Sequence, residues 1–137
     1  MISIWKEFEF SAAHYLPKVA TDHPCARMHG HNYKVRVHFS SDAPSEQGFV
    51  VDFRALNTIK AWLDEKFDHQ VLNDSLKNPT SEILAGYIMM NAPRPDPASA
   101  GENLHMDTVE VQETEKTGAI WMEPCPLHGT GSGGGSA

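Results

Sequence analysis

Two long segments alternate between apolar and polar residues, and this alternation constrains the fold more than any other feature of the chain. The first segment covers residues 2–14, and its apolar row is Ile2, Ile4, Phe8, Phe10, Ala12 and His14. The second starts at residue 29, and the corresponding row is His29, His31, Tyr33, Val35, Val37 and Phe39. Successive side chains of a strand point to opposite faces, so each segment predicts a β-strand with one buried face.

Histidines stand at the matching ends of both rows. His14 closes the first row, while His29 and His31 open the second and project from one face because they are two residues apart. A core histidine satisfied by a backbone carbonyl is the simpler interpretation for one such residue. Three at adjoining strand ends favour a metal site with one open position. Zinc suits three imidazoles best, although imidazole also accepts iron, nickel or copper.

Cys25 lies in the segment before this pair, and its residue type allows three interpretations. It can be an inert small hydrophobe, or a fourth ligand that closes a structural site. It can also be a thiolate whose pKa is lowered by a nearby metal, acting as a general base. The residues alone favour the base modestly and leave the other two open.

The rest of the chain predicts an α+β fold with antiparallel strands. Residues 48–51 are typical of a short strand, and Asp52 of an N-cap for a helix over 53–66. Residues 78–82 open a second helix, for which we expect a stripe of Ile83, Leu84, Tyr87 and Ile88. Later strands are expected around 109–113 and 119–122.

Two acidic residues, Glu113 and Asp68, are candidate functional residues. Glu113 continues the apolar row of Val109 and Val111, where a carboxylate is costly without a partner. A bidentate N–H pair, such as the edge of a 2-amino-4-oxopyrimidine ring, would suit it. Asp68 precedes His69 and could orient its imidazole for proton transfer, although an adjacent pair is by default only a surface pair.

Composition narrows the class of protein. We expect one domain over residues 1–124 and a flexible Gly/Ser-rich tail over 125–137. The net charge of −7 without a basic cluster argues against a nucleic-acid partner. No apolar run suits a membrane span and no secretory signal is apparent, so we expect a cytoplasmic protein. Its two cysteines, Cys25 and Cys125, are then reduced thiols.

Six stretches in this order resemble the 6-pyruvoyltetrahydropterin synthase family, and most closely its carboxy-forming bacterial branch. They are Phe10-Ser11-Ala12-Ala13-His14, Cys25-Ala26-Arg27-Met28-His29-Gly30-His31-Asn32-Tyr33, Val51-Asp52-Phe53, Phe67-Asp68-His69 with Leu72-Asn73, Pro79-Thr80-Ser81-Glu82, and Glu113-Thr114. The resemblance runs from Phe8 to about Trp121. The 91–105 loop and the region of Cys125 depart from the family pattern.

The resemblance implies a fold, an assembly and a set of roles. The fold is the tunnelling fold, an antiparallel four-stranded sheet with two helices on one face; trimers close a β-barrel and two trimers form a homohexamer with sites between subunits. It implies Zn²⁺ on His14, His29 and His31, and proton transfer by Cys25, Asp68 and His69. Glu113 would anchor a pterin, helped by Thr80, Ser81 and Glu82. Arg27 and Lys18 are our hypothetical phosphate contacts.

The spacing of Cys25 selects among the family's branches. Three residues separate it from His29, as in the carboxy-forming branch, whereas the pyruvoyl-forming enzymes carry a longer insert. A folate-linked branch has Glu in place of this cysteine. We therefore expect conversion of 7,8-dihydroneopterin 3′-triphosphate to 6-carboxy-5,6,7,8-tetrahydropterin, acetaldehyde and triphosphate. The alternatives are pyruvoyl formation by triphosphate elimination and a non-catalytic, zinc-stabilised pterin-binding module.

Overall fold

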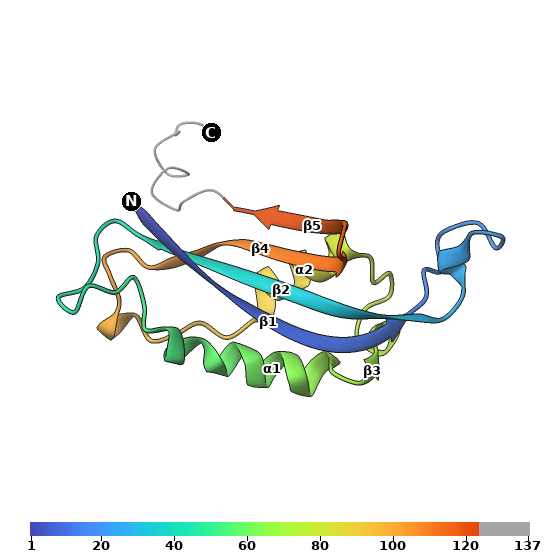
Figure 1. Cartoon of the computed structure of the whole chain (residues 1–137), viewed down its shortest axis with the longest axis horizontal. Coiled ribbons are helices and arrows are strands. Elements are labelled where there is room, and N and C mark those ends of the chain that lie inside the picture. The colour runs from blue at the N-terminus through green and yellow to red at the C-terminus, as the bar shows by residue number, and fades with distance from the viewer. Residues whose placement is uncertain (124–137) are drawn as a thin grey trace.

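A computed structural model describes residues 1–123, which form one twisted sheet covered by helices (Figure 1). The strand order is β3-β1-β2-β4-β5. Four longer strands pair with one another in antiparallel fashion: β1 (Ile2–His14), β2 (His29–Ser41), β4 (His105–Thr114) and β5 (Thr117–Met122). The expected α+β fold is confirmed. The sheet also has a fifth, two-residue strand, β3 (Gln70–Val71), which runs parallel to β1.

The alternating segments form the long central pair of the sheet. β1 and β2 remain in register from Ile2 opposite Ser41 to His14 opposite His29. Their inward rows are the buried ones, with Phe8, Phe10, Val35 and Val37 in the core. The 15–28 connection projects beyond the sheet and contains only a short 3-10 turn, Pro24–Ala26 (Figure 1). The two strands therefore end together, with their histidines beneath this loop.

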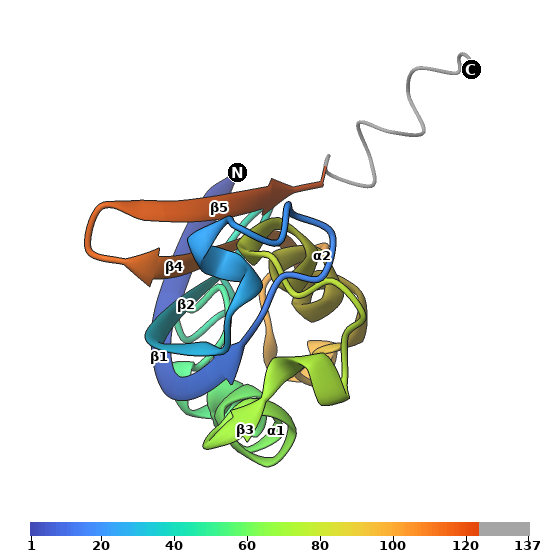
Figure 2. The ribbon, with the colours of Figure 1, turned by 90° about the vertical axis from the view of Figure 1, so that its right-hand side faces the viewer.

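Both α-helices lie on one face of the sheet (Figure 2). The side chain of Asp52 accepts a hydrogen bond from the Arg54 N–H, as expected of an N-cap. It caps a 3-10 turn, Phe53–Leu56, that leads into α1 (Asn57–Phe67). The second helix, α2 (Ser81–Asn91), begins after Thr80, whose hydroxyl accepts from the Ile83 N–H. Further 3-10 turns occur at Leu72–Asp74 and Pro97–Ser99.

Two local predictions were wrong. Residues 48–51 form no strand; Val50 and Val51 are buried side chains in an irregular segment. A short apolar run reports burial and does not by itself specify strand pairing. In α2, Ile83 is exposed, because the face turned to the core carries Ser81, Leu84, Ala85, Ile88 and Met89.

No helix within residues 1–123 has the length and apolar character needed to cross a bilayer. The expected tail at 125–137, with Cys125, lies outside the described residues.

Candidate metal centre and active site

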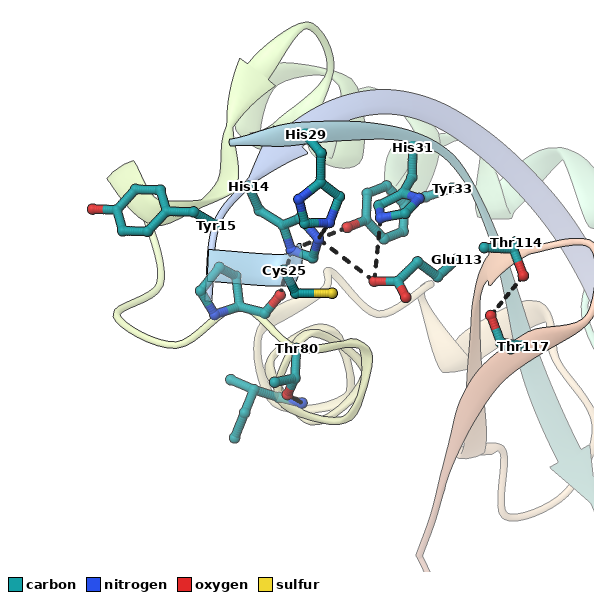
Figure 3. A network of polar contacts seen from close by, with 12 residues as sticks. His14, Tyr15, Cys25, His29, His31, Tyr33, Thr80, Glu113, Thr114 and Thr117 are labelled. Atoms are coloured by element: carbon teal, nitrogen blue, oxygen red, sulfur yellow. Dashed lines mark hydrogen bonds and ion pairs between the residues drawn. The ribbon is translucent and has the colours of Figure 1, made fainter. Parts of the chain in front are cut away.

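Strand register brings His14, His29 and His31 together. His14 lies directly opposite His29, and Ala12 lies opposite His31, so all three imidazoles share one face at one end of the β1–β2 pair. The three can each offer a ligand nitrogen, and these atoms all lie within 4.8 Å of one another. Figure 3 shows the rings converging from the two strands. Among the described residues, this is the group of His, Cys, Asp or Glu side chains suited to holding a metal ion.

Main-chain carbonyls fix how these rings present their nitrogens. The Nδ1 atom of His14 lies 2.8 Å from the Pro79 carbonyl oxygen, and that of His29 lies 2.7 Å from the Arg27 carbonyl oxygen. A carbonyl oxygen only accepts hydrogen bonds, so in both neutral rings Nδ1 carries the proton and Nε2 carries a lone pair. Such outer partners orient the histidine ligands of metal sites.

The Nε2 atoms then face one another without a donor between them. Those of His14 and His29 are 3.0 Å apart, and that of His31 is buried without a hydrogen-bond partner. Two lone pairs at this separation repel unless a proton or a cation lies between them. The three residues therefore fit a metal ion, which needs converging, unprotonated nitrogens.

Burial favours the neutral, metal-binding form of His14 and His31. Removal from water, the largest cause, lowers the pKa of both His14 and His31, and neighbouring histidines lower it further. The Pro79 carbonyl opposes this for His14, and Glu113 opposes it for both. Burial also raises the pKa of Tyr33, whose hydroxyl lies 3.4 Å from His14 Nδ1. The lowered pKa values of His14 and His31 favour their neutral forms, and the raised pKa of Tyr33 favours its neutral phenol.

Glu113 comes to this centre from β4. The pairing of Val35 with Val111 puts Glu113, two residues further along β4, on the same face as Tyr33. Its Oε1 atom lies 3.6 Å from Nε2 of both His14 and His31. The carboxylate thus stands against the open side of the imidazole group (Figure 3).

Cys25 lies in the Pro24–Ala26 turn above the histidines and is a half-buried free thiol. The His23 Nδ1 atom accepts the Cys25 N–H, and the Cys25 carbonyl accepts the Leu16 N–H. These bonds hold the turn against the start of the loop. The metal-suited group does not include the thiol, although Figure 3 draws Cys25 in the same view as that group.

Asp68 and His69 form a separate pair at the sheet edge. His69 takes a left-handed backbone conformation, with φ 58°, and its Nδ1 lies 2.9 Å from Asp68 Oδ2. The Ser11 N–H donates to Asp68 Oδ1, and this bond together with the one from His69 lowers the pKa of Asp68. The His69 side chain is 82% exposed. It borders an open hollow of about 430 Å³ that His31 also borders.

The remaining predicted residues take different positions. Thr80 caps α2 directly after Pro79, so the start of this helix lies beside His14 (Figure 3). Ser81 is buried under that first turn, while Glu82 is exposed on it. Arg27 and Lys18 are exposed residues of the 15–28 segment.

Sequence reasoning missed the partners that orient the rings. Pro79 and Arg27 act through carbonyl oxygens, which no side-chain pattern reports. Tyr33 was assigned only to the buried row. Its place two residues after His31 was the available signal, because that spacing puts both side chains on one face.

Comparison with known proteins identifies the family of this chain. The family described as 6-pyruvoyl tetrahydropterin synthase matches residues 3–124, and the chain belongs to this family. A Synechocystis protein named 6-carboxy-5,6,7,8-tetrahydropterin synthase is 41% identical over 132 residues, covering 88% of this chain and 93% of the relative. A Bacillus subtilis protein of the same name is 30% identical over 117 residues, covering 80% and 70%.

Solved structures share the fold. A Caenorhabditis elegans 6-pyruvoyl tetrahydropterin synthase superposes with a TM-score of 0.72 at 23% identity, covering 90% of this chain and 96% of that one. The family match and the named relatives make this chain an enzyme of the tetrahydropterin synthase class.

Proposed function

We propose that the protein converts 7,8-dihydroneopterin 3′-triphosphate and one water molecule to 6-carboxy-5,6,7,8-tetrahydropterin, acetaldehyde and triphosphate, as a zinc-dependent lyase of queuosine or 7-deazaguanine biosynthesis. The observation that carries this proposal is the set of three converging imidazoles in a chain with relatives of that name. The short Cys25-to-His29 spacing favours this product over the pyruvoyl compound.

His14, His29 and His31 would hold the zinc ion, leaving one coordination position for the substrate. A zinc ion held there would supply Lewis acidity toward the side-chain oxygens of the pterin, which would make the neighbouring C–H protons easier to remove. The residues around it then need only to move protons and to hold the ring in place.

Cys25 is the proposed base. A thiol near a dication and imidazoles is readily ionised, and its half-buried position limits access of water. Because the metal-suited group forms without the thiol, the sulfur is available for proton transfer instead of closing the coordination sphere. This favours the base over the structural ligand.

His69, oriented by Asp68, is the proposed second proton-transfer group. The Nδ1 atom is tied to the carboxylate, so Nε2 is free to take or return a proton at the substrate. In a single chain this imidazole is largely exposed, and we propose that a neighbouring copy covers it in a homohexamer. Glu113 would anchor the pterin N–H pair, with Thr80, Ser81 and Glu82 near its edge and Arg27 toward the phosphates.

The decisive experiment is identification of products by mass after incubating the zinc-loaded protein with dihydroneopterin triphosphate. Acetaldehyde with carboxytetrahydropterin supports the proposal. Pyruvoyltetrahydropterin would instead assign triphosphate elimination, and unchanged substrate would assign a non-catalytic pterin-binding module. The Cys25→Ala variant sharpens the result: turnover should fall by about 10²–10⁴-fold while zinc remains stoichiometric. Loss of zinc from that variant would support the closed structural site.

A further inference from the structure

Asn73 lies in a stretch, Leu72-Asn73, to which the proposed mechanism gives no role. It is a half-buried residue of the 3-10 turn Leu72–Asp74, directly after β3. Its Oδ1 atom accepts the Tyr15 N–H at 3.0 Å, and its Nδ2 atom donates to the Tyr15 carbonyl oxygen at 2.9 Å. One side chain therefore holds both main-chain polar groups of a single residue.

The side-chain amide is well suited to this double contact. It presents an acceptor and a donor side by side, as a peptide group does toward a neighbouring strand. β3 pairs with β1 at Ala12 and Ala13, so the Asn73 side chain continues the hydrogen bonding of this edge past the end of β1. A carboxylate in its place would still accept the Tyr15 N–H, but it would face the Tyr15 carbonyl as a second acceptor.

Tyr15 lies between the imidazole cluster and the turn that carries Cys25. It directly follows His14, and the next residue, Leu16, donates its N–H to the Cys25 carbonyl oxygen at 2.8 Å. Figure 3 shows the Tyr15 side chain directed away from the imidazoles. The main chain of Tyr15 thus makes the connection, and holding it fixes the path from His14 to the partner of Cys25.

Cys25 depends on such a contact because its turn has little packing of its own. The 3-10 turn Pro24–Ala26 buries none of its residues. The His23 ring accepts the Cys25 N–H from within the loop, and the Leu16 bond joins the turn to the start of the loop. Segments with few buried contacts open locally at low cost. The position of Cys25 therefore depends on where Leu16 lies.

We infer that Asn73 is a positioning residue for Cys25: its amide fixes Tyr15, and through Leu16 this contact holds the Cys25 turn above the imidazole cluster. The use of the thiol as a base rests on the proposed function, whereas the placement of the thiol does not. Asn73 lies on the same segment as His69, so positioning of His69 is the competing role that an experiment has to separate.

The rate of Cys25 alkylation by iodoacetamide tests the placement without substrate, in the zinc-loaded full chain. Peptide mapping by mass separates Cys25 from Cys125. Asn73→Asp loses the donor to the Tyr15 carbonyl, and alkylation of the half-buried thiol should become about fivefold faster, the change that loss of one ordinary hydrogen bond gives. Asn73→Ala removes both bonds without adding a charge and should give a larger increase. An unchanged or slower rate in both variants would overturn the inference.

Asn91→Asp is the matched control. The Asn91 Nδ2 atom also donates to a main-chain carbonyl, that of Tyr87 at 2.9 Å, but at the end of α2 away from Thr80. The alkylation rate of Cys25 should therefore stay as in the unmodified protein, and an equal increase in this variant would also overturn the inference. Zinc content and circular dichroism of each variant verify that the metal centre and the fold are intact.

Turnover distinguishes Cys25 from His69 as the residue through which Asn73 acts. Asn73→Asp should lower kcat by about 10–100-fold and change KM by less than about threefold, because the base is misplaced while the substrate contacts remain. The same substitution should have no further effect in a Cys25→Ala background and its full effect in a His69→Ala background. The reverse pattern would assign Asn73 to His69 and overturn the inference. Absence of turnover in the unmodified protein would contradict the proposed function alone, since alkylation does not depend on it.

Discussion

The imidazole cluster and the Asp68–His69 pair lie at the same end of the sheet, yet the chain holds them very differently. The cluster is built on two long strands, and His14 is 1% exposed. The pair precedes a strand of only two residues at the sheet edge, and the His69 side chain is 82% exposed. A single chain therefore holds the imidazole cluster in a buried, fixed arrangement and leaves the Asp68–His69 pair open to solvent.

Removing one member of each region should have opposite consequences for zinc. His29→Ala should lower zinc affinity by more than about 100-fold, since it deletes a ligand, and turnover should disappear with the metal. His69→Ala should keep stoichiometric zinc and a cooperative thermal transition, while turnover falls by about 10²–10⁴-fold. Metal analysis after dialysis, thermal melts and product assays check these outcomes. Loss of zinc from His69→Ala would contradict the assignment of zinc binding to the imidazole cluster alone.

Mixing two inactive variants tests whether the exposed pair serves a neighbouring chain. Cys25→Ala and His69→Ala chains, unfolded together and refolded, should recover activity, because some sites then combine an intact Cys25 with an intact His69. Random mixing in a symmetric assembly gives about one quarter of the sites. If both groups of a site came from one chain, every site would remain defective. Each variant refolded alone is the control.

Acid should destabilise the metal-free protein through the buried cluster. The pKa values of His14 and His31 are lowered in the folded chain, so below pH 6.5 the unfolded chain binds more protons than the folded one. Stability is then highest above pH 6.5 and falls as the pH drops through that value. Thermal melts of the metal-free protein between about pH 7.5 and 5.5 measure this. His31→Gln should show a shallower dependence, and an equal slope would contradict the assignment.

The smallest expected effect concerns α2, whose N-cap Thr80 directly follows Pro79. Thr80→Ala removes the hydroxyl that accepts the Ile83 N–H, and should lower the free energy of unfolding by about 1 kcal/mol. Thr58→Ala, at an exposed position of α1, should change it by less than about 0.5 kcal/mol. Denaturant unfolding of both variants provides the measurement. Equal effects would show that the cap does not stabilise α2.

Much of this could be predicted from periodicity, because strand parity is a local property. Alternation alone placed His14, His29 and His31 on one face, and Asp52 was recognisable as a cap. Contacts that depend on tertiary structure were not predictable. Neither the Pro79 carbonyl behind His14 nor the left-handed turn at His69, which makes adjacent side chains meet, leaves a residue pattern.

Sequence also could not tell where Glu113 would point. Its row predicted a buried carboxylate in need of a partner, and a heterocycle was the partner expected. The structure shows a second neighbour of this carboxylate, the imidazole cluster, because the pairing of β2 with β4 brings Glu113 to the histidines. Long-range strand pairing decides between such partners, and single-strand periodicity carries no information about it.

The carbonyl oxygens behind the imidazoles have a consequence for how this site tolerates mutation. Every residue type has a main-chain carbonyl, so replacing the Arg27 side chain leaves the acceptor of the His29 N–H in place. Ring orientation is thereby independent of which side chains occupy the flanking loops. Those loops can vary to suit a different substrate tail while the metal centre keeps its geometry. A scaffold of this kind lets specificity change through substitutions that do not endanger the chemistry it supports.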